Sequence, residues 1–167
     1  MVAYKSFKHI DPDEFHDKEL TLHDCVADHV SYVDGMLRFR FPDGFWVTPH
    51  HKVNSSEKAV RTDASVVDFS IEDIDDISVC VFTRNTWCWS RKTSVENWHM
   101  EQLIASVNSG KCTLEFITQY RTYGEQMWHC AIRSNKKPYY RECQLYLPET
   151  EATFFKYGSS TFENEIP

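Results

Sequence analysis

Histidine and aspartate side chains gather near the start of the chain in a combination that could bind a metal ion. The candidate ligands are His23, Asp24, His29, His50 and His51. Imidazole together with carboxylate suits zinc or non-haem iron when several such groups converge on one point. On a strand, however, His23 and His29 lie six residues and therefore about 20 Å apart. We predict no cofactor, with His23 and Asp24 bonding backbone groups near a strand start; a metal-dependent hydrolase is the alternative.

A second place for chemistry is Cys88, which stands between Trp87 and Trp89. The cations that follow, Arg91 and Lys92, could lower the pKa of its thiol, and a histidine partner would complete a Cys/His hydrolase. The competing interpretation is that the two tryptophans anchor a bend. No GxSxG, CxxC, HExxH, P-loop or GxGxxG motif occurs. We therefore expect that the chain is not an enzyme.

Tryptophan, tyrosine and arginine recur in two segments in the second half of the chain. These residue types are the ones most enriched among the residues that dominate binding energy at protein interfaces. Burial in the core is the competing interpretation for at least half of them. We predict an exposed binding patch formed by Trp87, Trp89, Arg91, Tyr120, Arg121 and Tyr123.

The charge balance limits the kind of partner. Lys and Arg number 18 against 25 Asp and Glu, which gives a formal net charge of −7. This charge disfavours nucleic acid and anionic lipid and favours a protein with a basic surface. No stretch approaches the roughly 20 apolar residues of a membrane span, and the first residues have no apolar export signal. The expected location is the cytoplasm, with the six cysteines reduced.

The elements that must position these residues are mostly strands. Between Leu22 and Thr48, apolar and polar residues alternate, with Asp-Gly turn signals between the runs. Leu37, Phe39 and Phe41 should face a core, and Arg38 and Arg40 should face away from it. These runs and the later strand patterns predict antiparallel meanders that form a curved sheet, a sandwich or a partial barrel.

One helix interrupts the strands. Thr93 and Glu96 have capping-box spacing, and apolar residues then recur with helical period at Met100, Leu103, Ile104 and Val107. The prediction is a helix over about 94–107 and hence an α+β fold. We expect one domain over 1–167, with a polar lead-in arm at 1–21 and an exposed loop at 49–64.

The segments LHDCV, MLRFRF and GFWV resemble, over about residues 20–48, small bacterial proteins without an assigned function, some of them grouped with immunity proteins of polymorphic toxin systems. The resemblance implies an acidic, cytosolic, non-enzymatic protein that neutralises a toxin by covering its active surface. It carries over no binding residues. The function we expect is thus a protein-binding domain of immunity type; a hydrolase, or a small-ligand carrier with an apolar pocket in a curved sheet, are the alternatives.

Overall fold

The computed structural model describes residues 4–8, 20–49, 51, 54–87, 90–122, 124–148 and 153–158. It describes the backbone alone for residues 4–8, 85–87, 90–92 and 121–122.

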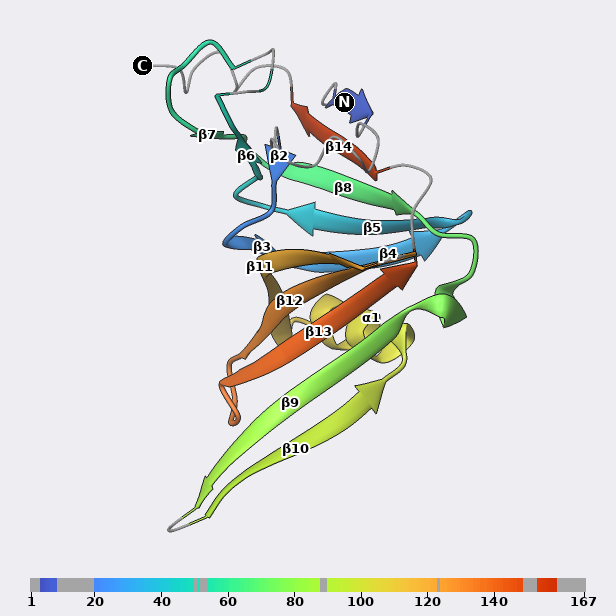
Figure 1. Cartoon of the computed structure of the whole chain (residues 1–167), viewed down its shortest axis with the longest axis vertical. Coiled ribbons are helices and arrows are strands. Elements are labelled where there is room, and N and C mark those ends of the chain that lie inside the picture. The colour runs from blue at the N-terminus through green and yellow to red at the C-terminus, as the bar shows by residue number, and fades with distance from the viewer. Residues whose placement is uncertain are drawn as a thin grey trace.

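Most of the strands belong to two large antiparallel sheets (Figure 1). The five-stranded sheet has the order β1 (Tyr4–Lys8), β14 (Thr153–Gly158), β8 (Ser65–Ser70), β5 (Met36–Phe41) and β4 (His29–Val33). The six-stranded sheet has the order β10 (Ser90–Trp98), β9 (Ser78–Trp87), β13 (Tyr140–Pro148), β12 (Glu125–Ser134), β11 (Cys112–Thr122) and β3 (Cys25–Ala27). The chain passes from one sheet to the other at β3 and β4, with Asp28 between them.

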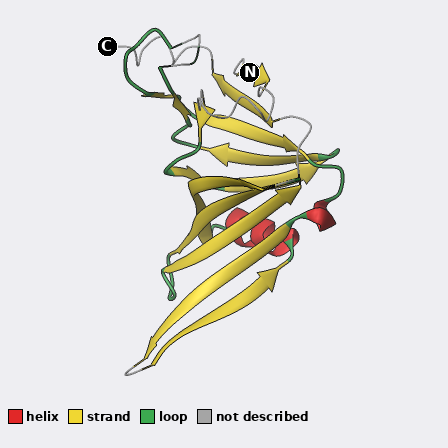
Figure 2. Ribbon diagram, viewed as in Figure 1, coloured by secondary structure: helices red, strands yellow, loops and turns green. Residues whose placement is uncertain are grey.

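Three short strands form a third sheet beside the two large ones: β2 (Leu20–Thr21), β6 (Trp46–Val47) and β7 (Val60–Arg61). A short 3₁₀ turn spans Ile74–Asp76, and the one α-helix of the described chain is α1 (Met100–Asn108) (Figure 2). The predicted α+β class with antiparallel sheets and one main helix is therefore confirmed. None of the helices in the described part is long and apolar enough to cross a membrane.

The alternation predicted for β5 sets the orientation of the five-stranded sheet. Leu37, Phe39 and Phe41 have no exposed surface, whereas Arg38 and Arg40 are exposed. β4 and β5 are joined by Asp34 and Gly35, both with positive φ, which is the conformation of the tight two-residue turns that connect paired strands. Sequence alternation and turn chemistry thus agree on which face is buried.

The core lies between the two large sheets and is built around Phe116 of β11. Its ring centroid lies 5.2 Å from that of Phe39, 5.5 Å from Phe41 and 5.2 Å from Trp128, in edge-on arrangements. Such arrangements place the positive ring edge against the negative ring face. The residue Trp128 is only 6% exposed, so it belongs to this packed core and not to a binding surface.

On the other face of the five-stranded sheet, a buried aspartate on one strand bonds to residues on the two strands beside it. The side chain of Asp68 on β8 has no exposed surface. It accepts two hydrogen bonds from Arg38 on β5, at 2.7 and 2.8 Å, and one from Lys156 on β14 at 2.5 Å. Burial by itself raises the pKa of Asp68, but these hydrogen bonds hold it below its ordinary value.

The predicted start of the helix is wrong. Residues 90–98 form strand β10, which pairs with β9 from Ser90 opposite Trp87 to Trp98 opposite Val79. The helix begins only at Met100, and its N-terminal bond runs from the His99 N–H to Gln102 Oε1 at 2.8 Å. Capping-box spacing at residues 93–96 also suits a strand, because both states tolerate those residue types, and pairing with β9 decides between them.

The helix that does form has the predicted apolar stripe. Met100, Leu103 and Val107 are buried in the same core as the sheets. At the other end of α1, the Asn108 side chain accepts from Val30 N–H at 2.8 Å and donates to Val30 C=O at 2.7 Å. Asn108 therefore mimics a neighbouring strand and covers the free edge of β4.

The segment 49–64 is not the uniformly exposed loop that its composition predicts. His51, Asn54, Val60 and Thr62 are buried, while Ser55 and residues 57–59 are exposed. The Asn54 side-chain amide donates to the carbonyls of Val47 and Lys58, which holds the loop together from inside. Two parts of the predicted arm, 1–21, are likewise strands: β1 pairs with β14, and β2 pairs with β6.

Glycine is needed at position 44, between β5 and β6, where the chain contacts the segment 49–64. Gly44 has φ +75°, and a Cβ there would lie 2.1 Å from the carbonyl oxygen of Thr62. The next residue is joined to the same threonine, because Phe45 N–H donates to Thr62 Oγ1 and Thr62 N–H donates to the Phe45 carbonyl. Any larger residue at 44 would push these two backbones apart.

Candidate functional site

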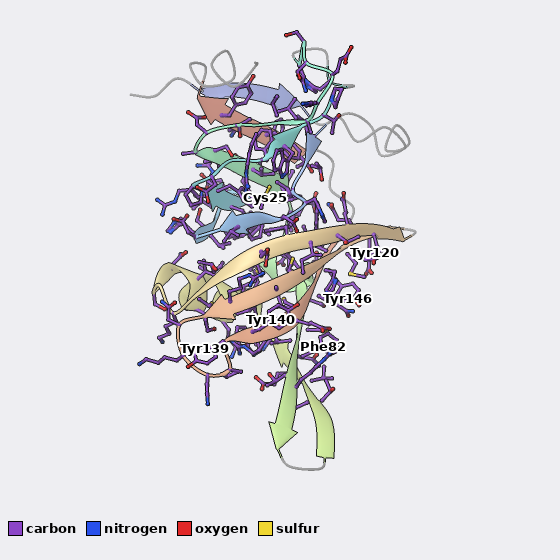
Figure 3. All side chains as sticks on the ribbon, turned by 90° about the vertical axis from the view of Figure 1, so that its left-hand side faces the viewer. Cys25, Phe82, Tyr120, Tyr139, Tyr140 and Tyr146 are labelled. Atoms are coloured by element: carbon purple, nitrogen blue, oxygen red, sulfur yellow. The ribbon has the colours of Figure 1, made fainter. Side chains whose placement is uncertain are left out.

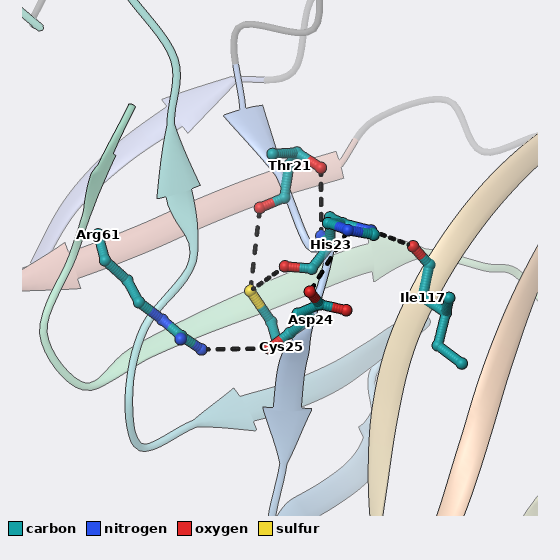
Figure 4. A network of polar contacts seen from close by, with 6 residues as sticks. All are labelled: Thr21, His23, Asp24, Cys25, Arg61 and Ile117. Carbon is teal, nitrogen blue, oxygen red and sulfur yellow. Dashed lines mark hydrogen bonds and ion pairs between the residues drawn. The ribbon is translucent and has the colours of Figure 1, made fainter. Parts of the chain in front are cut away.

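The histidine and aspartate at the start of β3 lie at a tight turn (Figure 4). Asp24 has φ +56°, and its N–H donates to the Phe116 carbonyl at 2.8 Å. His23 Nδ1 lies 2.5 Å from the Ile117 carbonyl, which can only accept, so Nδ1 carries the proton. His23 Nε2 faces Asp24 Oδ2 at 3.4 Å. The prediction that His23 satisfies a backbone group near a strand start is therefore confirmed.

Cys25 follows directly in the chain but has no arrangement for nucleophilic catalysis. The residue has no exposed surface, and its thiol faces the backbone carbonyls of His23 and Thr21, at 3.6 and 4.0 Å (Figure 4). Burial raises the pKa of the Cys25 thiol to about 11, although the nearby Arg61 opposes this shift. At neutral pH the sulfur is thus a protonated thiol beside carbonyls, and the His23 contact is made by the backbone and not by the imidazole.

The other predicted metal ligands do not come together with His23. His29 lies on β4 opposite Arg40, and His51 is buried in the loop after β6, where its N–H donates to the Thr48 carbonyl at 3.1 Å. His50 and the thiol of Cys88 lie outside the described residues. In the part of the chain that the structure describes, no three His, Cys, Asp or Glu side chains form a group that could hold a metal ion.

A more extensive candidate site is the outward side of the six-stranded sheet, which we call the open face. Residues alternate between this face and the core along each strand, as the register requires. The open face is formed by Phe82 and Arg84 of β9, Glu142, Gln144, Tyr140 and Tyr146 of β13, Met127, His129 and Arg133 of β12, and Glu115 and Tyr120 of β11. Figure 3 labels four of its aromatic side chains, which are spread over β11, β13 and β9.

Aromatic rings on the open face remain partly in solvent. Tyr120 is 50% exposed and Tyr140 is 48% exposed, while Phe82, Met127 and Tyr146 are half-buried by their neighbours. The opposite side of the same strands supplies buried residues such as Cys143, Leu145 and Leu147. One side of the sheet is therefore committed to the core, and the other presents aromatic surface.

The charges on the open face are paired with one another. Arg84 Nη2 donates to Glu142 Oε1 at 2.8 Å, and Arg133 Nε donates to Glu115 Oε2 at 2.5 Å. The Arg133 guanidinium also lies 5.9 Å from the centre of the Tyr140 ring, within the range of a cation–π contact. The face is therefore close to neutral and combines aromatic rings with arginines held in fixed positions.

The two segments of the predicted binding patch lie at different places on the six-stranded sheet. Tyr120 lies on the open face. Across the sheet, Tyr120 pairs with Met127, Met127 pairs with Tyr146, and Tyr146 pairs with Ser78 at the start of β9. Trp87 is nine residues further along β9, which corresponds to about 30 Å of strand. The two segments are therefore separated by most of the length of β9. Contact of both segments with one partner stays a prediction.

For the remaining residues of the predicted patch, the structure describes either the backbone alone or nothing. Trp87 and Arg91 lie at the far end of the β9–β10 hairpin, and Arg121 pairs with Gln126 near the end of β11. Trp89 and Tyr123 lie outside the described residues. Sequence reasoning missed that Phe82, Tyr140 and Tyr146 join Tyr120 on one face. The alternation of Tyr140, Glu142, Gln144 and Tyr146 with apolar residues was the available signal, since it marks the solvent side of β13.

No family model, no curated protein and no solved structure matches this chain.

Proposed function

We propose that this chain is a non-enzymatic protein-binding domain and that the open face is its binding surface. The observation that carries the proposal is the half-exposed state of Tyr120 and Tyr140 beside Phe82, Met127 and Tyr146 on one sheet face. Tyrosine supplies a large contact area with few rotatable bonds, so little entropy is lost when a partner covers it. Residues of this kind surrounded by partly buried neighbours are typical of interface centres.

The electrostatics support two separate contributions to recognition. The arginines of the open face are already paired with Glu115 and Glu142, so a partner meets a nearly neutral surface at short range. The net charge of −7 acts over longer distances and attracts a partner with a basic surface. Among the acids that supply it are Glu72, Asp73, Asp75 and Asp76, all exposed on the segment before β9. Charge then raises the association rate, and aromatic contact lowers the dissociation rate.

The mechanism that fits this surface is occlusion. The face is carried by strands paired on both sides, so it can bind without a costly rearrangement. In its most specific form the proposal is an immunity-type role, in which the face covers the active surface of a bacterial toxin. That form rests on the resemblance, over about residues 20–48, to small bacterial proteins of that group.

The test is differential capture from the native source followed by affinity measurement. The double variant Tyr120→Ala/Tyr140→Ala is compared with wild type and with Val33→Ala, which removes an exposed apolar residue from the other large sheet. We expect a partner that wild type and the Val33 variant bind alike and that the double variant binds at least about tenfold more weakly. Equal binding by all three proteins, each with an unchanged melting temperature, would refute the open face as the binding surface.

The immunity role has its own readout. Cells that express the captured partner should stop growing, and co-expression of wild type should restore growth while the double variant should not. If the partner does not impair growth, the toxin-neutralising form of the proposal is wrong, while protein binding by the open face is judged by affinity alone.

A further inference from the structure

The six-stranded sheet ends at β10, and β10 has β9 on one side and no strand on the other among the described residues. It is a long edge, since its pairing with β9 continues over the whole stretch from Ser90 to Trp98. β9 in turn pairs with β13 only from Ser78 to Phe82. The far part of the β9–β10 hairpin therefore extends beyond the rest of the sheet (Figure 1). The side chains of residues 93–97 are exposed along it.

The outward hydrogen-bonding groups of β10 can be assigned from the register. Two residues connect β9 to β10, so the pair that flanks them, Trp87 and Ser90, is a hydrogen-bonded pair. Hydrogen-bonded and non-hydrogen-bonded pairs then alternate along the ladder. The residues that direct N–H and C=O away from β9 are consequently Arg91, Thr93, Val95 and Asn97. This edge differs from that of β4, where Asn108 occupies the backbone groups of Val30.

We propose that β10 pairs in antiparallel fashion with β10 of a second copy of this chain, around a two-fold axis at Ser94. This register places Lys92 of each copy opposite Glu96 of the other, so two opposite-charge pairs form per dimer. The Glu96 carboxylate is held at the edge, because it accepts from the Trp98 indole N–H at 3.1 Å. A shift of two residues in either direction places Lys92 opposite Ser94 or Trp98, and both charge pairs are lost. Lysines on an edge strand usually prevent pairing with another strand. Here Lys92 instead lies opposite Glu96 of the second copy, because the two identical strands run in opposite directions.

The same register accounts for an exposed apolar residue. Val95 is 57% exposed at the edge of the open face, beside Phe82. In the dimer it lies opposite Thr93 of the second copy, and a β-branched pair of this kind is favourable across strands. Pairing about this axis joins the two six-stranded sheets with their open faces on one side. The proposal holds whatever the open face binds, and it can be tested without a partner.

Sedimentation velocity over a range of protein concentrations tests the pairing directly. Wild type should dimerise, and Lys92→Glu and Glu96→Lys should each raise the dissociation constant at least about tenfold, because two attractive pairs become repulsive. The double variant Lys92→Glu/Glu96→Lys should return the constant to near the wild-type value. Lys111→Glu, an exposed lysine of equal charge on the turn after α1, should leave it unchanged.

Val95→Pro gives a second, independent variant. Proline removes one outward N–H, and edge strands tolerate it where the N–H faces solvent. The variant should be monomeric with the circular dichroism spectrum of wild type. A wild-type protein that stays monomeric up to about 1 mM would overturn the proposal. So would a dimer that Lys92→Glu does not weaken, or whose weakening the double variant fails to reverse.

Discussion

Replacement of Asp68 by asparagine tests how much the buried acid on β8 contributes to stability. Asp68 accepts three hydrogen bonds from Arg38 and Lys156, and its own side chain has no exposed surface. Asparagine keeps the volume but offers one acceptor oxygen and turns an amide group toward a cation. With that oxygen in the place of Oδ2, the bonds from Arg38 Nη2 and Lys156 remain and the bond from Arg38 Nε is lost. The two remaining bonds become roughly half as strong without the charge of the carboxylate, so the loss equals about two of the three contacts.

The magnitude follows from the exposure of the cations. A hydrogen bond to a charged group contributes about 1.5–3 kcal/mol. The side chains of Arg38 and Lys156 are 48% and 30% exposed, so water replaces part of what they lose and the lower value applies. We expect Asp68→Asn to lower the free energy of unfolding by about 3 kcal/mol at pH 7. For a denaturant slope of about 2 kcal/mol per M, the urea midpoint falls by roughly 1.5 M.

The pH dependence provides the decisive comparison. Because the pKa of Asp68 is lowered in the folded state, its stabilisation is fully present above the unfolded value of about 3.9 and is lost as the pH falls through the folded value. The difference between wild type and Asp68→Asn should therefore shrink in strongly acidic solution. Asp28→Asn is the control: its two bonds from Arg40 are similar in length, but the side chain of Asp28 is 33% exposed whereas that of Asp68 is fully buried. This control should cost less than about 1 kcal/mol. A loss at Asp68 no larger than this, or one that does not change between pH 7 and pH 2, would refute the reasoning.

Two further predictions concern the edge of β4 and the buried thiols. Asn108→Ala should lower the free energy of unfolding by about 2 kcal/mol or more, because it leaves both backbone groups of the buried Val30 without their partner. Urea unfolding measures this loss. Hydrogen exchange at the Val30 amide should also become faster. An unchanged midpoint would show that Asn108 does not stabilise this edge. Cys130 and Cys143 should resist alkylation at pH 8 in the folded protein, because burial raises the pKa of both thiols, that of Cys143 to about 12. Both thiols should be labelled in urea without reductant. Protection that persists in urea would indicate disulfides instead.

Local patterns in the sequence determined some of the strands and which side of them is buried. In β5, the two-residue period assigns Leu37 and Phe39 to the core and Arg38 to the opposite face, as the structure shows. This works because the period of a strand is a property of neighbouring residues and needs no knowledge of distant ones. The same holds for the apolar stripe of α1, where Met100 and Leu103 are recognised from helical spacing alone.

Pairing between distant segments decided the rest. Residues 94–98 fit a helix by local spacing, but they belong to the nine register pairs that join residues 90–98 to β9. Hydrogen bonds to a neighbouring strand outweigh weak local preferences, so these residues form a strand. The order of the strands then determined the candidate site. It brought Tyr120 of β11 together with Tyr140 and Tyr146 of β13, and it left Trp87 at the far end of β9. The spacing of residues along the sequence does not determine the order of the strands in a sheet, because the packing of the whole core decides which strands lie side by side.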